Sequence, residues 1–440
     1  MFNKSSSTMP GGRDRQASLR QPNHRWKVLG LGVAANASFS AAFSGLPTTA
    51  VFMRSDYHLG NAELGLVLGL LGLGIALSEL PWGLLTDRLG DRRVLLSGLG
   101  ATAAALVLMA LFAAPTHSHV PGLPWLAAGM LVVGLMGGSV NGASGRAVMS
   151  WFREGERGLA MSIRQTAVPL GGGLGALVLP TLAGWGGFAS VYALLALLCA
   201  VTALFAWHWL HEPPSDVVAP AAAAKKSLPA AATAGNPLRD GLVWRIAIAI
   251  GVLCAPQLAV LTFATIFLHD FSHAGVATIS ATIVAIQVGA IVMRIWSGRW
   301  TDRNGNRRAY MRTCSQLTAL IFAALAVIVV FAGSGPQHAG VTAAIIVMLL
   351  LGGICGSAWH GVAYAELATL AGAQRAGTAL GMANTCVFVT MFVTPLAIPA
   401  LLAAWSWPAV WVVGSICALI ALPLFPRPEP TVARMKVQAA

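Results

Sequence analysis

The sequence predicts an all-α integral membrane protein in which twelve transmembrane helices form two pseudo-symmetric six-helix bundles. Three observations predict this fold. The 440 residues are 56% apolar and only 10% charged, with a mean hydropathy of +0.72, whereas soluble domains carry about 25% charged residues. The apolar residues gather in runs of about 20 or more, enough to cross a ~30 Å hydrocarbon layer. A polar loop motif also recurs at the same place in both halves of the chain.

The apolar runs define the predicted helices, with six runs in each half. They cover approximately residues 28–52, 64–85, 94–114, 123–151, 158–183, 188–210, 242–268, 276–300, 310–332, 341–367, 377–402 and 407–425.

The recurring motif occupies residues 83–93 and returns at 298–308, an offset of 215, with Gly, Thr, Asp, Arg, Gly, Arg and Arg matching at identical spacing. Each copy follows a long apolar run. A polar loop repeated in two halves of a hydrophobic chain indicates a duplicated membrane bundle. That architecture is typical of transporters.

The motif resembles the signature between the second and third helices of the major facilitator superfamily, written roughly G-x-L-x-D-R-x-G-R-[RK]. The resemblance implies two domains that rock around a central site, with loop residues clasping the cytoplasmic side. Trp300 replaces the usual leucine in the second copy, so we expect a weaker second clasp. By matched position, or by closeness to these loops, the predicted clasp and gate residues are Asp87, Arg88, Arg92, Asp302, Arg303, Glu79 and Arg294.

The positions of Lys and Arg predict the topology, because these residues stay on the cytoplasmic side in short loops. Of the 28 Lys and Arg residues, only Arg54 falls in a predicted outer loop. We therefore expect a multi-pass protein of the plasma (inner) membrane with both termini in the cytoplasm. The predicted organisation is a disordered cytoplasmic tail (1–25), the first bundle (26–210), a cytoplasmic linker (211–240), the second bundle (241–426) and a second cytoplasmic tail (427–440).

The formal charge of +13 is explained by this topology, so we expect no nucleic-acid partner. The six cysteines lie in apolar segments without CxxC spacing, and we predict no disulfide and no metal site. The sequence contains no GxxxxGK[ST] phosphate-binding loop. We expect no cofactor, and energy supplied by a gradient, with a proton as the coupling ion. We expect a monomer whose partners are the lipid bilayer and a small-molecule substrate.

Polar residues inside predicted helices mark the candidate substrate site, because charge within a bilayer is costly and usually functional. Arg164 lies seven residues into its helix, roughly 10 Å at 1.5 Å per residue, while the offset of 219 places Ala383 at the equivalent position of the other half. An unpaired guanidinium there predicts an anionic ligand. Arg146 is expected to reach the surface by snorkelling. The predicted substrate-binding residues are Arg164, Gln165, Asn141, Asn36, Gln257, Gln287, His360 and Asn384.

His360 is also the predicted proton-coupling residue, because imidazole exchanges protons near neutral pH. A buried histidine that bonds to a neighbouring helix is an equal alternative. Tyr364 follows at i+4 on the same face.

These residues favour a proton-coupled secondary transporter that takes up a small organic anion. Residues 151–166 resemble the junction of helices four and five in superfamily members that carry carboxylates. The alternative is a drug/proton antiporter, since Pro169 and Gly172-Gly173 resemble part of its helix-five motif. Such an exporter prefers a deep acidic residue, and Glu79 is predicted to lie near the boundary. A remote alternative is an intramembrane protease with Ser144 as its nucleophile and His360 as its base. We expect no enzymatic activity.

Overall fold

The computed structural model describes residues 23–116, 118–211, 235–333 and 338–428. Every regular element in these ranges is helical. Most of the expected tails and linker lies outside the described residues. The first bundle consists of α2 (His24–Gly45), η1 (Leu46–Thr49), α3 (Ala50–Asp56), α4 (Asn61–Leu89), α5 (Asp91–Phe112), α6 (Leu123–Gly137), α7 (Ser139–Trp151), α8 (Arg157–Gln165) and α9 (Ala167–Trp209).

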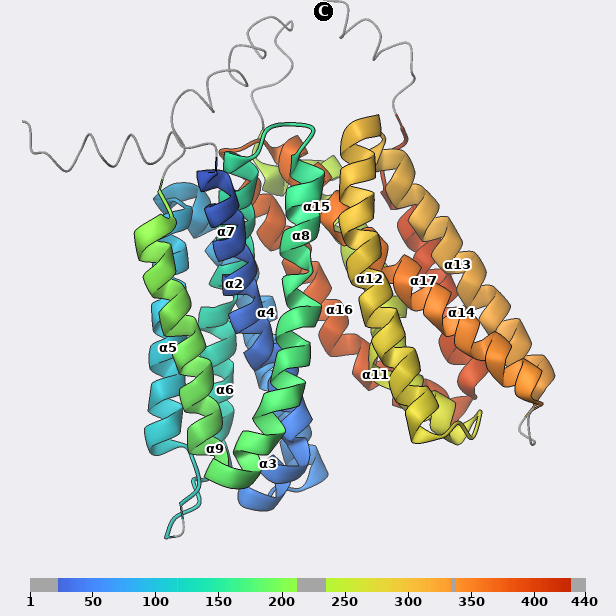
Figure 1. Ribbon diagram of the computed structural model, residues 1–440, viewed down its shortest axis with the longest axis horizontal. Coiled ribbons are helices and arrows are strands. Elements are labelled where there is room, and N and C mark those ends of the chain that lie inside the picture. The colour runs from blue at the N-terminus through green and yellow to red at the C-terminus, as the bar shows by residue number, and fades with distance from the viewer. Residues whose placement is uncertain (1–22, 117, 212–234, 334–337, 429–440) are drawn as a thin grey trace, which may run out of the picture.

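The second bundle repeats this arrangement (Figure 1). After η2 (Pro237–Arg239) it consists of α11 (Gly241–Asp270), α12 (Val276–Asn304), α13 (Arg307–Ala332), α14 (Ala339–Ala358), α15 (His360–Ala371), α16 (Ala376–Ala404) and α17 (Trp407–Leu424).

Twelve membrane-length helical segments follow from these elements. Eleven candidate spans are long and apolar enough to cross a membrane in the described ranges, and one of them, Arg157–Trp209, is 53 residues long. Its backbone leaves the helical region at Gly187, where φ is 63° and ψ is −174°. Such a conformation suits glycine, which has no Cβ to clash. The chain turns back at this point, so the long segment is two spans and the predicted number is confirmed.

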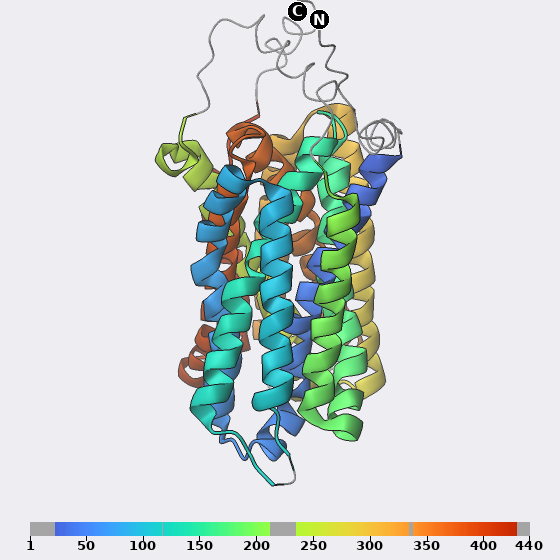
Figure 2. The same cartoon turned by 90° about the vertical axis from the view of Figure 1, so that its left-hand side faces the viewer.

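The first residues of α2, the last residues of α9 and the last residues of α17 lie on the same side of the molecule, which we call the terminal face (Figures 1 and 2). The ring of His24 is hydrogen-bonded to the carbonyl of Trp209 at 3.0 Å. Arg312, close to the start of α13, donates to the carbonyl of Phe425 at 3.0 Å. We call the opposite end the far face.

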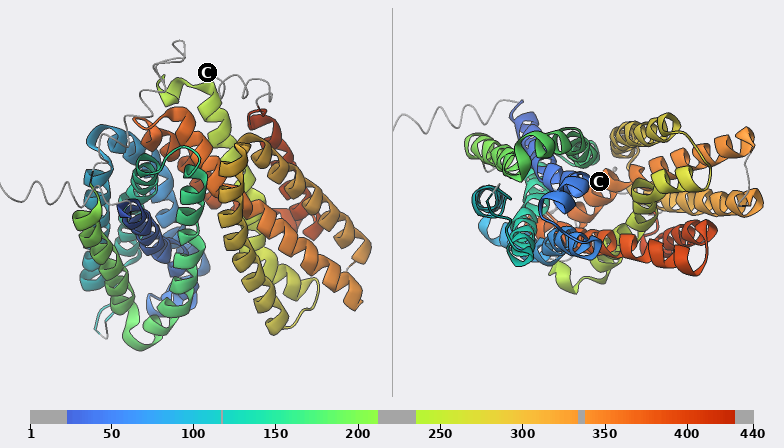
Figure 3. Two further views of the ribbon diagram at one scale, coloured as in Figure 1. Left: turned by 45° about the horizontal axis from the view of Figure 1, so that its top comes forward. Right: turned by 90° about the horizontal axis from the view of Figure 1, so that it is seen from below.

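The two bundles meet near the terminal face and diverge toward the far face (Figures 1 and 3). Two helix pairs lead this contact, α4 with α16 and α8 with α12, and α7 and α15 extend it by packing against α16 and α8. The arrangement is that of a molecule closed at the terminal face.

Glycines allow the two helix pairs to approach closely. A Cβ added to Gly83 of α4 would lie 2.5 Å from the carbonyl oxygen of Gly377 in α16. A Cβ on Gly298 of α12 would lie 2.5 Å from the carbonyl oxygen of Gly158 in α8. The repeat offsets of 215 and 219 relate Gly83 to Gly298 and Gly158 to Gly377. The duplication therefore preserved both halves of one contact.

Gly83→Ala is expected to depopulate the form closed at the terminal face, because the new methyl group overlaps backbone that cannot move aside. Overpacking of this kind costs about 1–3 kcal/mol, which corresponds to a population change of about 5- to 150-fold. Electron spin resonance between nitroxides on exposed Arg93 and Arg303 measures the separation of the bundles. Gly65→Ala in the same helix is the control, since no atom lies within 4 Å of its added Cβ. Equal distance distributions in the two variants would contradict the prediction.

Candidate substrate site and terminal-face clasp

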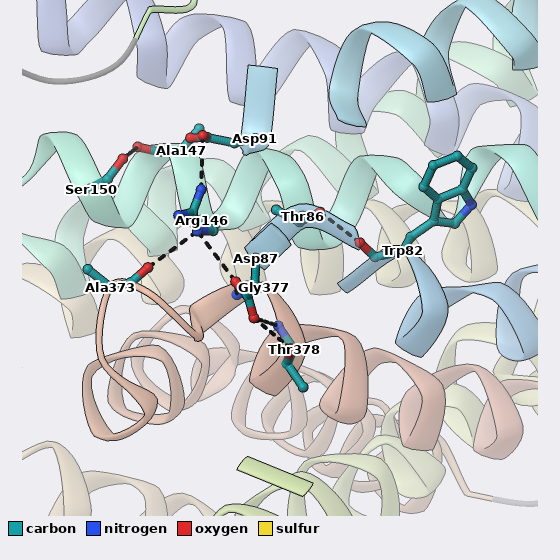
Figure 4. A network of polar contacts seen from close by, with 10 residues as sticks. All are labelled: Trp82, Thr86, Asp87, Asp91, Arg146, Ala147, Ser150, Ala373, Gly377 and Thr378. Carbon is teal, nitrogen blue, oxygen red and sulfur yellow. Dashed lines mark hydrogen bonds and ion pairs between the residues drawn. The ribbon is translucent and has the colours of Figure 1, made fainter. Parts of the chain in front are cut away.

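Asp87, at the end of α4, joins the first bundle to the first turn of α16 (Figure 4). Its carboxylate accepts hydrogen bonds from the backbone N–H groups of Gly377 (2.9 Å) and Thr378 (2.7 Å). The Thr378 hydroxyl donates a third bond of 2.6 Å. The first N–H groups of a helix have no partner within it and carry partial positive charge, so a carboxylate is a favourable ligand for them.

Asp302, at the end of α12, makes the reciprocal contact with the first turn of α8. It accepts from the backbone N–H groups of Gly158 (3.0 Å) and Leu159 (2.8 Å), and Arg307 lies 2.7 Å away. Trp300 is 37% exposed and stacks on Trp296, so it does not disturb these bonds. The geometry shows no sign of the weaker second clasp that the sequence suggested.

The arginines of the clasp differ from those predicted. The side chains of Arg88 and Arg303 are exposed and make none of the clasp contacts. Arg92 donates to the backbone carbonyl of Trp207 at 2.9 Å, and its guanidinium lies over the Trp207 ring. Both residues belong to the first bundle. Of the residues that the superfamily resemblance implies, the two carboxylates make contacts between the bundles and these arginines do not.

Arg146 of α7 takes the place of these arginines, and the expectation that it snorkels is wrong. Its guanidinium lies 3.4 Å from Asp87 and 3.1 Å from Asp91, and it also donates to the carbonyl of Ala373 at 3.3 Å (Figure 4). One arginine thus ties the loop motif to the second bundle. The offset of 219 sets Arg146 against Ala365, so the comparison that singled out Arg164 could also have found it.

Glu79 and Arg294 lie deeper than the sequence indicated. The helices α4 and α12 continue to Leu89 and Asn304. Both residues therefore stand ten positions from a helix end, about 15 Å at 1.5 Å per residue, rather than one turn. The polar residues of the motif belong to these helices, so a helix length counted from apolar residues alone is too short.

Glu79 is completely buried at the contact between the bundles. Its carboxylate accepts from the amide of Asn141 in α7 at 2.5 Å and from that of Asn384 in α16 at 3.2 Å. The Tyr364 hydroxyl, from α15, donates to the side-chain amide oxygen (Oδ1) of Asn384 at 2.6 Å. The carboxylate is therefore held by both bundles at once.

Arg164 of α8 is 2% exposed and lies within electrostatic reach of this carboxylate. Its Nε and Nη2 donate to the Ser144 hydroxyl at 3.0 and 2.8 Å, and Nη2 donates to the Asn141 carbonyl at 2.8 Å. Glu79 and Arg164 attract one another electrostatically, and Asn141 bonds to both. Among the described residues no ion pair includes Arg164, and its hydrogen bonds go to neutral groups, so the expectation of an anionic ligand stays a prediction.

Arg294 of α12 also crosses the contact. It donates to the backbone carbonyl of Gln165 in the first bundle at 2.7 Å and to that of Ser357 in its own bundle at 3.0 Å. The Gln257 amide donates to the Ser357 hydroxyl at 2.9 Å. Gln165 and Gln257 thus lie near the same contact, and their role in substrate binding stays a prediction.

The remaining predicted residues are less well connected. His360 is half-buried, stacks on Trp359, and bonds to the Ser357 carbonyl at 3.1 Å, with its Nε2 3.7 Å from the Cys254 sulfur. Asn36 is buried, and neither of its amide atoms has a partner in the described ranges. Gln287 is half-buried on α12, outside the contacts given above.

The geometry does not support the protease alternative. The Ser144 hydroxyl donates to the Val140 carbonyl and accepts from Arg164. His360 is engaged with Ser357 and Cys254 in the other bundle. In the described ranges, no hydrogen bond joins this serine to this histidine, so the base that the alternative requires is missing.

Comparison with known proteins agrees with this fold. The sequence pattern of the Major Facilitator Superfamily matches residues 32–319. An uncharacterised MFS-type transporter of Mycobacterium tuberculosis (strain CDC 1551 / Oshkosh) is 28% identical over 403 residues, 91% of this chain and 85% of the relative.

Two solved structures share the architecture. The proton:xylose symporter XylE has a TM-score of 0.73 and 14% identity, over 91% of this chain and 95% of the symporter. The human organic anion transporter MFSD10 has a TM-score of 0.69 and 16% identity, over 92% of this chain and 100% of that protein. With the family match spanning well over half of its length, this chain belongs to the Major Facilitator Superfamily of membrane transporters.

Proposed function

We propose that the protein takes up a small organic anion across the plasma (inner) membrane by proton-coupled alternating access. The observation that carries the proposal is the excess of positive charge deep in the contact between the bundles, below the clasp formed by Asp87 and Asp302. Arg164 and Arg294 are both at most 4% exposed there, and Glu79 is the acid that accompanies them. Buried charge is expensive unless it is balanced. A bound anion would supply the missing negative charge.

Arg164 is the proposed ligand of the substrate's anionic group. A guanidinium presents a planar fork of donors that matches a carboxylate. Gln165, Asn141, His360 and Asn384 surround the same contact from both bundles and would add polar contacts. A substrate held by both bundles is what alternating access requires, because its release can then accompany their separation.

The terminal face is proposed to be the cytoplasmic side. The distribution of Lys and Arg supports this orientation, since the predicted outer loops contain one such residue. With the clasp at Asp87 and Asp302 closed, the described form is then the one that faces outward. The clasp must open before an imported anion can leave.

One observation favours the second candidate, a drug/proton antiporter. Such an exporter would use a deep acidic residue, and Glu79 is deeper than the sequence indicated. Its carboxylate is already bonded to two amides and attracted to Arg164. A lipophilic cation would therefore compete with a resident arginine, and the anion proposal is the better supported. The two structural neighbours, a sugar symporter and an organic anion transporter by name, show that this fold does not itself select a substrate.

A thermal-shift screen of the purified protein distinguishes the two candidates, because only a ligand that binds the folded state raises its apparent stability. The panel contains gluconate, benzoate and succinate as anions, and tetraphenylphosphonium as a lipophilic cation. We expect at least one carboxylate to raise Tm and the cation to leave it unchanged. Stabilisation by tetraphenylphosphonium alone would replace the proposal with the exporter.

A further inference from the structure

We propose that Glu79, rather than His360, is the proton-binding group, and that it competes with the transported anion for Arg164, so that a proton and an anion bind together. The inference rests on the proposed transport of anions. It names the residue that couples the proton and explains why coupling is obligatory.

The position of Glu79 is the first support. It is fully buried, about 15 Å from the end of α4 at 1.5 Å per residue, where the bundles meet. The amides that bond to its carboxylate, from Asn141 and Asn384, belong to different bundles. A proton that reaches this carboxylate therefore acts on a contact that must break during transport.

One cation, Arg164, interacts electrostatically with Glu79 among the described residues. Arg164 of α8 is the charged group that faces it, and Tyr364 of α15 is the nearby titratable group. The helices α7 and α16 present neutral amides to it. No charged residue occurs in α6, and those of α5 all lie in its first turn, at the terminal face. The cation of α7, Arg146, is paired with Asp87 and Asp91, so Arg164 is the cation that offsets the charge of Glu79.

Competition for this guanidinium couples the two ligands. While Glu79 is ionised, it offsets part of the charge of Arg164, and a substrate carboxylate at the same guanidinium would meet its repulsion. Two carboxylates that share one site hold a proton between them, because both cannot remain charged. Addition of one proton to a Glu79 oxygen makes a neutral carboxylic acid and leaves Arg164 to the anion. By linkage, the proton raises the affinity for the anion as much as the anion raises that for the proton.

Protonation also weakens the contact between the bundles. An ionised carboxylate only accepts hydrogen bonds, whereas a protonated oxygen also carries a donor and is a weaker acceptor. The amide nitrogens of Asn141 and Asn384 are donors, one to each oxygen, so protonation weakens the bond to the oxygen that takes the proton. The bond from Asn384 is the longer, at 3.2 Å against 2.5 Å. Uptake of the proton thus loosens the link to α16 as the anion arrives.

His360 is less suited to this role. Its hydrogen-bonded neighbours, Ser357 and Cys254, belong to the second bundle, so its protonation breaks no bond between the bundles. Arg294 lies within electrostatic reach and repels a second positive charge. A proton on His360 would add to the positive excess instead of relieving it.

An infrared titration of the purified transporter in lipid tests the inference without a substrate. As the pH is lowered, a protonated carboxyl group that is shielded from water gives a separate carbonyl-stretch band. We expect this band in the wild-type protein and in His360→Gln, and its loss in Glu79→Gln. Asn384→Ala removes a hydrogen bond to the carboxyl group and is expected to shift the band, which assigns it without a change at Glu79. In Arg164→Ala the band is expected to persist to more alkaline pH, because the cation that favours the charged form is gone.

Two results would overturn the inference. One is a band that remains in Glu79→Gln and does not move in Asn384→Ala. The other is a titration that Arg164→Ala leaves unchanged, because the shared cation is then not Arg164. The titration tests the protonation of Glu79, and the thermal-shift screen tests the binding of an anion. Because the two measurements are independent, either proposal can be contradicted without the other.

Discussion

Replacing Arg164 with alanine is expected to abolish binding of the organic anion while the protein still folds and inserts. The guanidinium is buried and aligned by Ser144 and Asn141, and truncating one partner of a buried charge pair costs about 2–5 kcal/mol. That is a loss of affinity of about 30-fold or more. Arg164→Lys is also expected to bind much more weakly, because an ammonium group lacks the planar fork of donors. The fold tolerates a neutral residue at this place, as Ala383 occupies the equivalent position in the other half.

The measurement is the ligand-induced rise in Tm for the carboxylate that stabilises the wild type. Arg303→Ala is the matched control, since this arginine is exposed and lies outside the clasp and the site. It should bind as the wild type does. If Arg164→Ala retains full affinity, Arg164 is a structural or gating residue and the anion assignment loses its main support.

Asp87→Asn is expected to reduce transport severely without affecting membrane insertion. The carboxylate accepts three hydrogen bonds from the start of α16 and lies beside Arg146. An asparagine keeps one acceptor oxygen but has no charge, and hydrogen bonds to charged groups contribute about 1.5–3 kcal/mol. The form closed at the terminal face should therefore be depopulated. Asp302→Asn should be comparably damaging, since it removes the reciprocal cap and the partner of Arg307.

Uptake of the identified anion into cells, normalised to the amount of protein at the membrane, tests this prediction. Asp270→Asn makes the same chemical change at the far end of α11, where the side chain is 58% exposed, and should transport normally. Normal uptake by Asp87→Asn at equal expression would remove the proposed clasp.

The sequence was sufficient for the helices, because an apolar run predicts its own helix. The duplicated motif named Asp87 and Asp302 as candidates by comparison within one chain, and both make contacts between the bundles. It could not name their partners, since Gly377 lies 290 residues after Asp87 and no local pattern relates the two.

The errors have a common cause. An apolar run indicates a helix only as far as its last apolar residue, but α4 continues through Asp87 to Leu89. Glu79, which the run places near the boundary, therefore lies deeper. Its attraction to Arg164 depends on the packing of four helices, and neither residue carries a sequence signal for the other. Arg146 was misjudged in the same way, because a cation at a helix end usually reaches water unless an acid from another helix lies nearer.

Asp87 and Asp302 each bind the first turn of a helix in the other bundle. These contacts therefore depend on the order in which the helices are synthesised. Domains of a growing chain form from the amino terminus onward, so α8 is made long before Asp302, which follows Gly158 by 144 residues. Until α12 arrives, the first amides of α8 have only water as a partner. The partner of Asp87 is synthesised later still, because it lies in a helix that begins at Ala376. A nascent first half therefore cannot adopt its closed conformation alone, and the transporter becomes able to alternate only when its penultimate helix has been inserted.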